Sequence, residues 1–216
     1  MWIKIGTVFV MTGSFFFGYG SLVNRKTHIY GDAHPARVTG WRRVWRHTAI
    51  RPVAFLTAVP SAGTDIEGLI AGVPNGDWHA LDEREHAYDR VELRDLDDHP
   101  LPYTPQAAIY SIPVGKHSAP TMAHPILLSY LDVVVQGYDQ EFGAEGVQRF
   151  FDTTDGWDAP ILDDRAHPQY PRHQLLTAAQ RSMVDQALIS RDAGIIPLTH
   201  DHREALAIPE GSPSKY

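Results

Sequence analysis

Cysteine is absent from the 216-residue chain. Its absence excludes disulfide bonds, thiolate metal sites and a cysteine nucleophile, and it fits a cytoplasmic protein, which is the location we expect. An excess of basic residues is absent as well, because the formal net charge is −7 at pH 7. A protein that neutralises the phosphates of a nucleic acid needs a basic face, so we expect no nucleic-acid partner.

Long apolar runs are also lacking. The apolar stretch within residues 1–10 is too short to span a bilayer and has no clear signal-peptide cleavage site, so we expect no membrane partner. We interpret residues 1–10 as an upstream extension ahead of Met11. With 43% hydrophobic residues the chain can bury one core, and we expect a single domain over residues 1–216. Its core is expected at about 13–142, with a helical C-terminal extension at 143–216. Nothing in the sequence indicates an oligomeric state.

Near the start of the chain an apolar run ends abruptly in glycines. The aromatic residues Phe15–Phe17 predict a buried strand, and Gly18 and Gly20 let the backbone turn sharply and approach a ligand closely. Backbone N–H groups of Gly18, Gly20 and Ser21 can converge on a carboxylate, a phosphate or a developing oxyanion. An ordinary strand-to-loop turn explains the same residues. A dinucleotide-binding loop does not, because Val23 stands where G-x-G-x-x-G requires its third glycine.

The pattern of apolar residues predicts an α+β fold. Six stretches rich in β-branched and aromatic residues are expected to form strands, at residues 15–17, 37–47, 54–59, 66–73, 91–96 and 107–112. A turn at residues 60–63 makes the third and fourth stretches a hairpin. Helical spacing predicts a short helix at residues 77–88 and further helices at 125–142, 145–151 and 178–191. We therefore expect a small mixed β-barrel of about six strands with an inserted short helix and C-terminal helices. The proline-rich loop at residues 157–172 is of the kind that often borders a site.

The short helix carries one unusual carboxylate. Asp77 is a plausible N-cap, and one helical face carries Trp78, Leu81, Glu85 and Tyr88. Desolvation among such neighbours would raise the pKa of Glu85 above its reference of about 4.3, toward the range useful to a general base. The alternative is a solvated run of charges in which Glu85 pairs with Arg84 or Arg90.

The loop Tyr19-Gly20-Ser21-Leu22 and the later segment Leu81-Asp82-Glu83-Arg84-Glu85 together resemble the γ-glutamylcyclotransferase superfamily, most closely its bacterial and ChaC-like members. That family has a loop of the form Tyr-Gly-Ser-(Asn/Leu), followed by a catalytic glutamate in a motif like Leu-Asp-x-x-Glu. The resemblance covers roughly residues 15–142. Matched in this way, the glutamate is Glu85, which helical spacing also selects.

The resemblance implies an intramolecular aminolysis. The free α-amino group of a γ-glutamyl substrate attacks its own γ-carbonyl, which gives 5-oxoproline and releases an amine or amino acid. Glu85 serves as the base and then as the acid, and no metal or organic cofactor is required. Backbone N–H groups from Gly20, Ser21 and Leu22 receive the oxyanion or the substrate's α-carboxylate, and substrate binding also involves the pocket walls Tyr19 and Tyr88. An ordinary position in the core is the alternative for each of these tyrosines.

Several questions stay open at this point. Leu22 stands where the dipeptide-specific branch has Asn, as it does in the glutathione-degrading branch. The substrate is therefore open, and dipeptides, glutathione and γ-glutamylamines are all candidates. Arg165 and Arg172 are candidates to bind a second substrate carboxylate. Ser21 is a weaker candidate as a hydrolase nucleophile, because it does not lie in a G-x-S-x-G motif and no histidine partner can be named from the sequence. The 12 histidines form no H-E-x-x-H or comparable metal motif. A catalytically inactive module of the same fold that binds an acidic metabolite is the alternative function.

Overall fold

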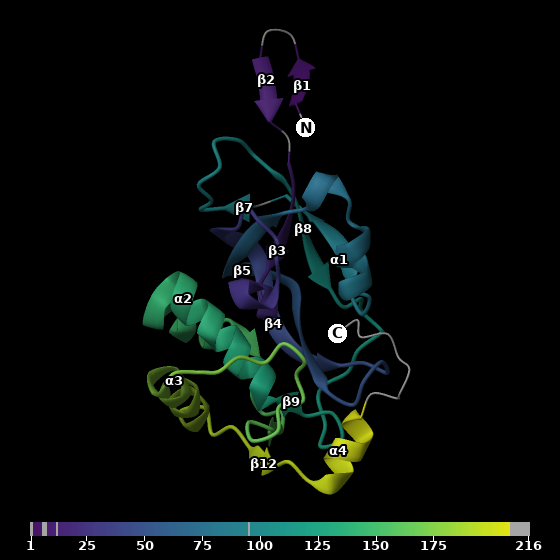
Figure 1. Cartoon of the computed structure of the whole chain (residues 1–216), viewed down its shortest axis with the longest axis vertical. Helices are drawn as coiled ribbons and strands as arrows, with labels where there is room; N and C mark the ends of the chain where they lie inside the picture. Colours follow the sequence, from purple (N-terminus) through teal and green to yellow (C-terminus); the bar gives the residue numbers. More distant parts are fainter. Residues whose placement is uncertain (1, 6–7, 12, 95, 208–216) are drawn as a thin grey trace.

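The structure is a computed structural model that describes residues 2–5, 8–11, 13–94 and 96–207. Its centre is a curled, mixed seven-stranded sheet (Figure 1). Six strands follow the order β10-β4-β5-β3-β8-β6, and β7 pairs with β4 beside this path. Their bounds are β3 Ser14–Gly18, β4 His34–His47, β5 Ala54–Gly72, β6 Asp89–Leu93, β7 Leu96–Asp97, β8 Gln106–Ser111 and β10 Thr154–Asp155. This half-barrel with its helices confirms the expected fold class.

The strand β3 lies in the interior of this sheet, antiparallel to β5 and parallel to β8. Its three phenylalanines are at most 2% exposed, because both faces of the sheet are covered. Phe15 and Phe17 pack into the main core, whereas Phe16 packs into a smaller cluster with Leu22 and Leu81. Alternating side chains of one strand therefore join two cores, and the strand is held firmly where it delivers the chain to the glycine loop.

The hairpin predicted at residues 60–63 is wrong. The two stretches that we expected to pair with each other are one continuous strand, β5, and both pair with β4. The register shifts between Thr39 and Trp41, where Gly40 has a φ of 83°. Pro60 lies opposite Trp41. A bulge in the partner strand thus lets the chain bend at Pro60 without reversing, which local turn residues alone could not indicate.

Apart from the short α1, the helices follow strands β3 to β8 of the main sheet in sequence, and β10 comes directly after α2. Their bounds are α1 His79–Arg84, α2 Leu128–Asp152, α3 Ala178–Ile189 and α4 His200–Leu206, with three-residue 3₁₀ turns η1 Ser21–Val23, η2 Arg25–Thr27 and η3 Pro74–Gly76. Gly143 interrupts α2 with a φ of 66° and a ψ of −171°, so the two helices predicted there are present on either side of it. Thr177 and Gln180 form a capping box that starts α3.

A second, three-stranded sheet was not predicted. It has the parallel order β12-β11-β9, built from β9 Ile126–Leu127, β11 Ile161–Asp163 and β12 Ile195–Pro197. The first half of α2 is covered on all sides, and Val133, Val134 and Val135 have no exposed surface. Helices α2 and α3 contact each other. In the described part of the chain, no helix is both long and apolar enough to cross a bilayer.

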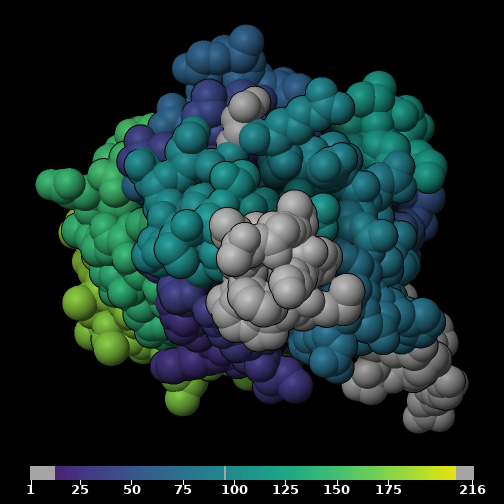
Figure 2. All heavy atoms as spheres, turned by 90° about the horizontal axis from the view of Figure 1, so that it is seen from above, coloured from purple at the N-terminus to yellow at the C-terminus, as the bar shows by residue number. Residues whose placement is uncertain are grey.

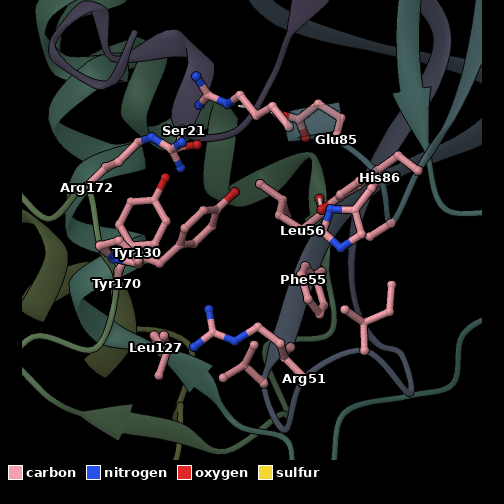
Figure 3. Close-up of a pocket in the computed structure, with 17 residues that line it drawn as sticks. Ser21, Arg51, Phe55, Leu56, Glu85, His86, Leu127, Tyr130, Tyr170 and Arg172 are labelled. Carbon is pink, nitrogen blue, oxygen red and sulfur yellow. Dashed lines mark hydrogen bonds and ion pairs between the residues drawn. The ribbon is translucent and has the colours of Figure 1, made fainter. Parts of the chain in front are cut away.

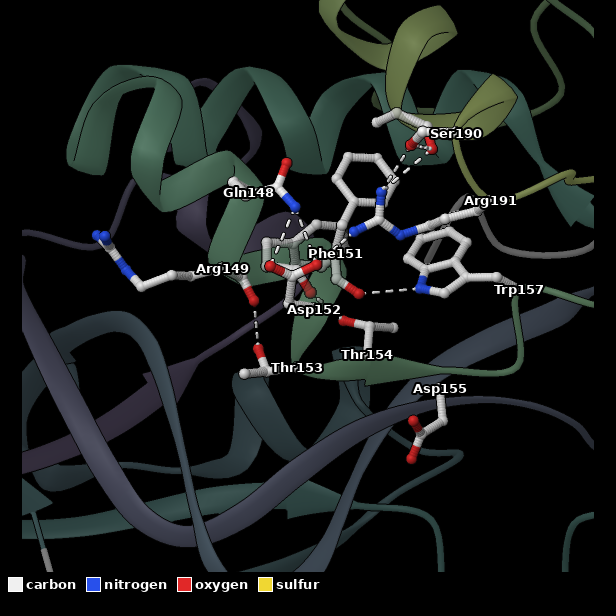
Figure 4. Close-up of polar contacts among 12 residues, drawn as sticks. Gln148, Arg149, Phe151, Asp152, Thr153, Thr154, Asp155, Trp157, Ser190 and Arg191 are labelled. Carbon is white, nitrogen blue, oxygen red and sulfur yellow. Dashed lines mark hydrogen bonds and ion pairs between the residues drawn. The ribbon is translucent and has the colours of Figure 1, made fainter.

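Side-chain hydrogen bonds fix the C-terminal end of α2 (Figure 4). Arg191, just beyond α3, pairs with Asp152 at the last turn of α2. The indole of Trp157 donates to the Phe151 carbonyl at 3.1 Å, and the Thr154 hydroxyl donates to the Phe150 carbonyl at 2.6 Å. These contacts tie α2 to α3 and to the edge of the main sheet, so that the helix is a rigid support.

The N-terminal strands β1 Trp2–Ile5 and β2 Val8–Met11 form an antiparallel pair outside the main sheet. Figure 1 shows this pair at the top, projecting from the rest of the molecule. Figure 2, seen from above, shows that the chain between β5 and β8, coloured blue to teal, forms much of the surface at that end.

Candidate active site

A cavity of about 130 Å³ opens between the main sheet and the helical half of the chain (Figure 3). Five segments line it: the glycine loop at Ser21, the chain leading into β5 with the start of that strand, the end of α1 with the turn after it, the junction of β9 and α2, and residues 170–172 of the long loop. Because one water needs about 10–15 Å³ of such space, the cavity has room for a small organic molecule.

A smaller pocket of about 40 Å³ adjoins the cavity on the side of the glycine loop. The two share Ser21, Leu56, Glu85, Tyr88 and Tyr130 in their walls. The six residues predicted as the site all line one or both of these spaces, namely Tyr19, Gly20, Ser21, Leu22, Glu85 and Tyr88. Residues more than sixty positions apart in sequence are thus brought to one place.

The carboxylate of Glu85 is held at the C-terminal end of α1. The helix is shorter than predicted: it begins at His79 and ends at Arg84, with Glu85 as its C-cap. The Glu85 N–H still donates to the Leu81 carbonyl at 2.9 Å, and the Tyr88 N–H donates to the Glu85 carbonyl at 2.8 Å. The N-cap of the helix is Trp78 and not Asp77 as predicted. The Asp77 carboxylate accepts a hydrogen bond from the N–H of His79, the first residue of the helix. The tight turn after the helix aims Glu85 and Tyr88 at the cavity.

The surroundings of Glu85 favour its protonated form. Its side chain is only 18% exposed, and this burial raises its pKa above the ordinary value. The positive charges of Arg84 and Arg172 oppose the rise, and the Arg84 Nε lies 3.1 Å from the Glu85 Oε1. Of the two pairings considered from sequence, the one with Arg84 is present, whereas Arg90 pairs with Asp82. Burial nevertheless outweighs these charges, so the carboxyl group is poised to accept and return a proton.

The glycine loop is anchored from below by buried hydrogen bonds. The hydroxyl of Tyr138 on α2 lies 3.0 Å from the Tyr19 carbonyl and accepts from the fully buried Arg43 at 2.6 Å. Asn24, also fully buried, donates to the Val133 carbonyl at 3.0 Å and to Gln136 Oε1 at 2.9 Å. These bonds bind the backbone on both sides of residues 20–22 to α2, so the loop has one defined position.

The backbone of the loop is presented to the cavity. The 3₁₀ turn uses the N–H groups of Val23 and Asn24, which donate to the Gly20 and Ser21 carbonyls at 3.0 Å. The N–H groups of Ser21 and Leu22 are outside this pattern, as expected for the first residues of a helical turn, and the Ser21 N–H donates to the Tyr130 hydroxyl. A Cβ on Gly20 would lie 2.7 Å from the Tyr130 hydroxyl, so the glycine is needed for this close approach.

Tyr19 and Tyr88 serve as walls whose hydroxyls are already bonded to backbone. The Tyr19 hydroxyl donates to the Tyr110 carbonyl and accepts from the Ala58 N–H at 3.1 Å. The Tyr88 hydroxyl donates to the Leu56 carbonyl at 3.0 Å. Burial raises the pKa of both tyrosines, so both remain neutral at physiological pH.

Sequence reasoning missed part of the wall. Tyr130 on α2 and Tyr170 in the long loop meet edge to face, with ring centroids 5.0 Å apart at 89°, and both line the cavity. Tyr130 is half-buried in a helical pattern typical of core residues, which gives no indication of a site. Of the two arginines proposed to bind a second carboxylate, Arg172 lines the cavity. Arg165 does not; its guanidinium pairs with Asp132 and Asp185.

No cluster of metal-ligating side chains accompanies these residues. Within residues 13–94 and 96–207, no group of three or more His, Asp or Glu side chains is arranged to hold a metal ion. The residues with polar side chains that line the cavity or the adjoining pocket are Ser21, Glu85, His86, three arginines and five tyrosines. Such a set is suited to binding an organic acid and to moving protons.

The fold and the cavity thus define an α+β protein with a candidate small-molecule site, in which the mostly buried carboxyl group of Glu85 and the glycine loop line the same cavity. The chain belongs to the family described as "Gamma-glutamyl cyclotransferase, AIG2-like", whose model matches residues 16–125, about half of the chain. Membership supports a γ-glutamyl cyclotransferase type of activity in general. The matched region contains the glycine loop and Glu85.

Solved structures share this fold. A γ-glutamyl cyclotransferase is 13% identical with a TM-score of 0.51, over 81% of this chain and 99% of that one. An uncharacterized protein from Homo sapiens is 12% identical with a TM-score of 0.50, over 79% of this chain and 97% of that one. At this identity the likeness concerns the fold alone. No curated protein matches the chain in sequence.

Proposed function

We propose that the protein cyclises a γ-glutamyl group to 5-oxoproline and releases the amine or amino acid attached to it. The observation that carries the proposal is the sheltered Glu85 carboxyl group in the wall shared by the cavity and the glycine-loop pocket. A carboxyl group with a raised pKa can take a proton from an amine near neutral pH and give it back. The same group is the glutamate selected by the family motif.

In the proposed reaction, the α-amino nitrogen of the substrate forms a bond to the γ-carbonyl carbon while Glu85 accepts its proton. The carbonyl oxygen becomes an oxyanion, which the N–H groups of Ser21 and Leu22 stabilise. Glu85 then protonates the leaving nitrogen as the γ-carbon–nitrogen bond breaks. No water is consumed, and the products are 5-oxoproline and a free amine. Because both reacting groups belong to one molecule, the cavity need only hold the substrate in a folded conformation.

The charges around the cavity support a defined orientation for the substrate. In Figure 3 the Arg172 guanidinium lies toward Ser21, at the same end of the cavity as Glu85. We assign it, together with the loop N–H groups, to the α-carboxylate of the γ-glutamyl group. Tyr19, Tyr88 and Tyr130 wall the space in which the ring closes. Leu22 is buried and supports the turn from below.

The second candidate function is binding without turnover. It is favoured by the contact of 3.1 Å between Arg84 and Glu85, because a cation so close stabilises the ionised carboxylate. In that case the protein would hold an acidic metabolite in the same cavity. Both functions use the same cavity, but only the enzyme forms a product.

The deciding experiment is a panel of γ-glutamyl dipeptides, glutathione and γ-glutamylamines incubated with purified protein, with 5-oxoproline and the released amine quantified by mass spectrometry. Stoichiometric release of both products from at least one compound is expected. If calorimetry shows that a compound of the panel binds but no 5-oxoproline forms, the protein is a binding module and not an enzyme. If no compound of the panel binds and none yields 5-oxoproline, both candidate functions are refuted.

A further inference from the structure

The cavity has two chemically different ends. Ser21 and Glu85 lie at one end in Figure 3, with Arg172 beside them. Arg51 and Leu127 lie at the opposite end, next to Phe55. If the γ-glutamyl group occupies the first end, the second end is what remains for the leaving group.

The second end is mostly apolar. Val53 and Leu127 are each 5% exposed, and Phe55 is half-buried beside them. Leu127 comes from the small second sheet and Phe55 from β5, so the two halves of the molecule close around this space. Such a surface gains from contact with an aliphatic or aromatic side chain of a ligand. It offers little to a flexible charged amine.

Basic side chains outnumber acidic ones in the wall of the cavity. Arg51, Arg84 and Arg172 contribute guanidinium groups, and Glu85 is the one carboxylate among the residues that line it. Arg84 pairs with Glu85, whereas Arg51 and Arg172 occupy opposite ends. A guanidinium has five N–H donors, so Arg51 can hold a carboxylate while keeping contacts with other groups. Two separated cations match a ligand that carries two separated carboxylates.

Among γ-glutamyl compounds, those whose leaving group is an α-amino acid carry two carboxylates, and those whose leaving group is a simple amine carry one. We propose that Arg51, Phe55 and Leu127 form the leaving-group subsite and select γ-glutamyl α-amino acids with an apolar side chain. Arg51 binds the carboxylate of the leaving amino acid, and Phe55 and Leu127 contact its side chain. This assignment rests on the proposed cyclotransferase function and narrows its substrate class.

The test compares γ-glutamyl-leucine with γ-glutamyl-3-methylbutylamine, which is the same molecule without the leucine carboxylate. The wild-type protein is expected to favour γ-glutamyl-leucine in kcat/KM by about tenfold or more, the size of one charge-assisted contact. In Arg51→Gln the ratio of the two kcat/KM values is expected to fall at least tenfold, mainly through the KM of γ-glutamyl-leucine. Arg51→Lys keeps the charge and should retain part of the preference. Arg94→Gln is the matched control, because Arg94 is exposed and lines none of the described cavities.

A second comparison tests the apolar part. In Phe55→Ala the preference for γ-glutamyl-leucine over γ-glutamyl-glycine is expected to shrink, and far-ultraviolet circular dichroism checks that each variant is folded. Equal use of the leucine and amine compounds by wild type, or an unchanged ratio in a folded Arg51→Gln, would overturn the subsite while leaving the cyclotransferase in place. Absence of 5-oxoproline from every compound would overturn the proposed function and the subsite with it.

Discussion

Replacing Gly137 with alanine is expected to push α2 away from the glycine loop. A Cβ at Gly137 would lie 2.7 Å from the backbone nitrogen of Asn24 and 2.9 Å from both the Asn24 Cα and the Val23 carbonyl carbon. All three are backbone atoms, so no side-chain rotation relieves the contact. Helix and loop must separate by about 0.7 Å before the shortest contact returns to the ordinary range, which begins at 3.4 Å.

The size of the effect follows from two opposing terms. Overpacking costs about 1–3 kcal/mol, and the rigid backbone contacts place this case near the upper end. Alanine in a helix interior regains about 1 kcal/mol relative to glycine. The free energy of unfolding should therefore fall by about 2 kcal/mol, which lowers the Tm of a chain of this size by about 4–8 °C. The separation also stretches both hydrogen bonds of Asn24, so the N–H groups of the loop move relative to Glu85 and the rate of 5-oxoproline formation drops at least about tenfold.

Urea unfolding and the 5-oxoproline assay measure the two effects of Gly137→Ala. The matched control is Gly31→Ala, because a Cβ there meets nothing within 4 Å, and its stability should change by less than about 0.5 kcal/mol. If Gly137→Ala is as stable and as active as the control, α2 does not support the loop in the way described.

Three further expectations concern charged groups, namely Arg84 and Glu85 in the cavity wall and the buried Asp164 outside it. Arg84→Gln removes the nearest cation that lowers the pKa of Glu85, so the acid limb of the plot of kcat/KM against pH should move to higher pH. If that limb does not move, a group other than Glu85 titrates there. Because the pKa of Glu85 is raised in the folded state, its carboxyl reduces stability as pH rises from the ordinary value through the raised one. Urea unfolding should accordingly show that the free energy of unfolding of Glu85→Gln rises relative to that of wild type between pH 4 and pH 8. A difference between the two proteins that does not change with pH would contradict the raised pKa. Asp164 is fully buried and accepts from the Ser129 N–H and the Gln169 N–H, both at 2.8 Å, so Asp164→Ala should lower the free energy of unfolding by about 3 kcal/mol. The exposed Asp163→Ala should change it little, and equal losses in the two variants would refute the buried role.

The central strand and the main helices could be predicted because their signals are local. Three adjacent phenylalanines followed by glycine mark β3 and its loop, and helical spacing with Gly143 as a break marks both halves of α2. The hairpin at residues 60–63 failed because the path of β5 is set by its partner β4, far away in sequence. The strands of the second sheet are two or three residues long, too short for an alternation of side chains to be visible.

The candidate site was predicted as far as its motifs reach. The spacing that selected Glu85 holds even though the helix ends at Arg84, because the following turn brings Glu85 and Tyr88 into the wall of the same cavity. The contribution of Tyr130, Tyr170 and Arg172 depends on packing between segments forty residues apart. No local pattern brings those segments together. The leaving-group end of the cavity could therefore be read only from the structure.

The most direct test of the account is the rate of 5-oxoproline formation from a γ-glutamyl substrate by Glu85→Gln, measured beside Glu83→Gln, an exposed neighbour on α1. Loss of a general acid–base group costs about 10²–10⁴-fold, so Glu85→Gln should fall by at least 10²-fold while Glu83→Gln stays close to wild type. A Glu85→Gln variant that forms 5-oxoproline at the wild-type rate would contradict the assignment of Glu85 as the group that moves the proton.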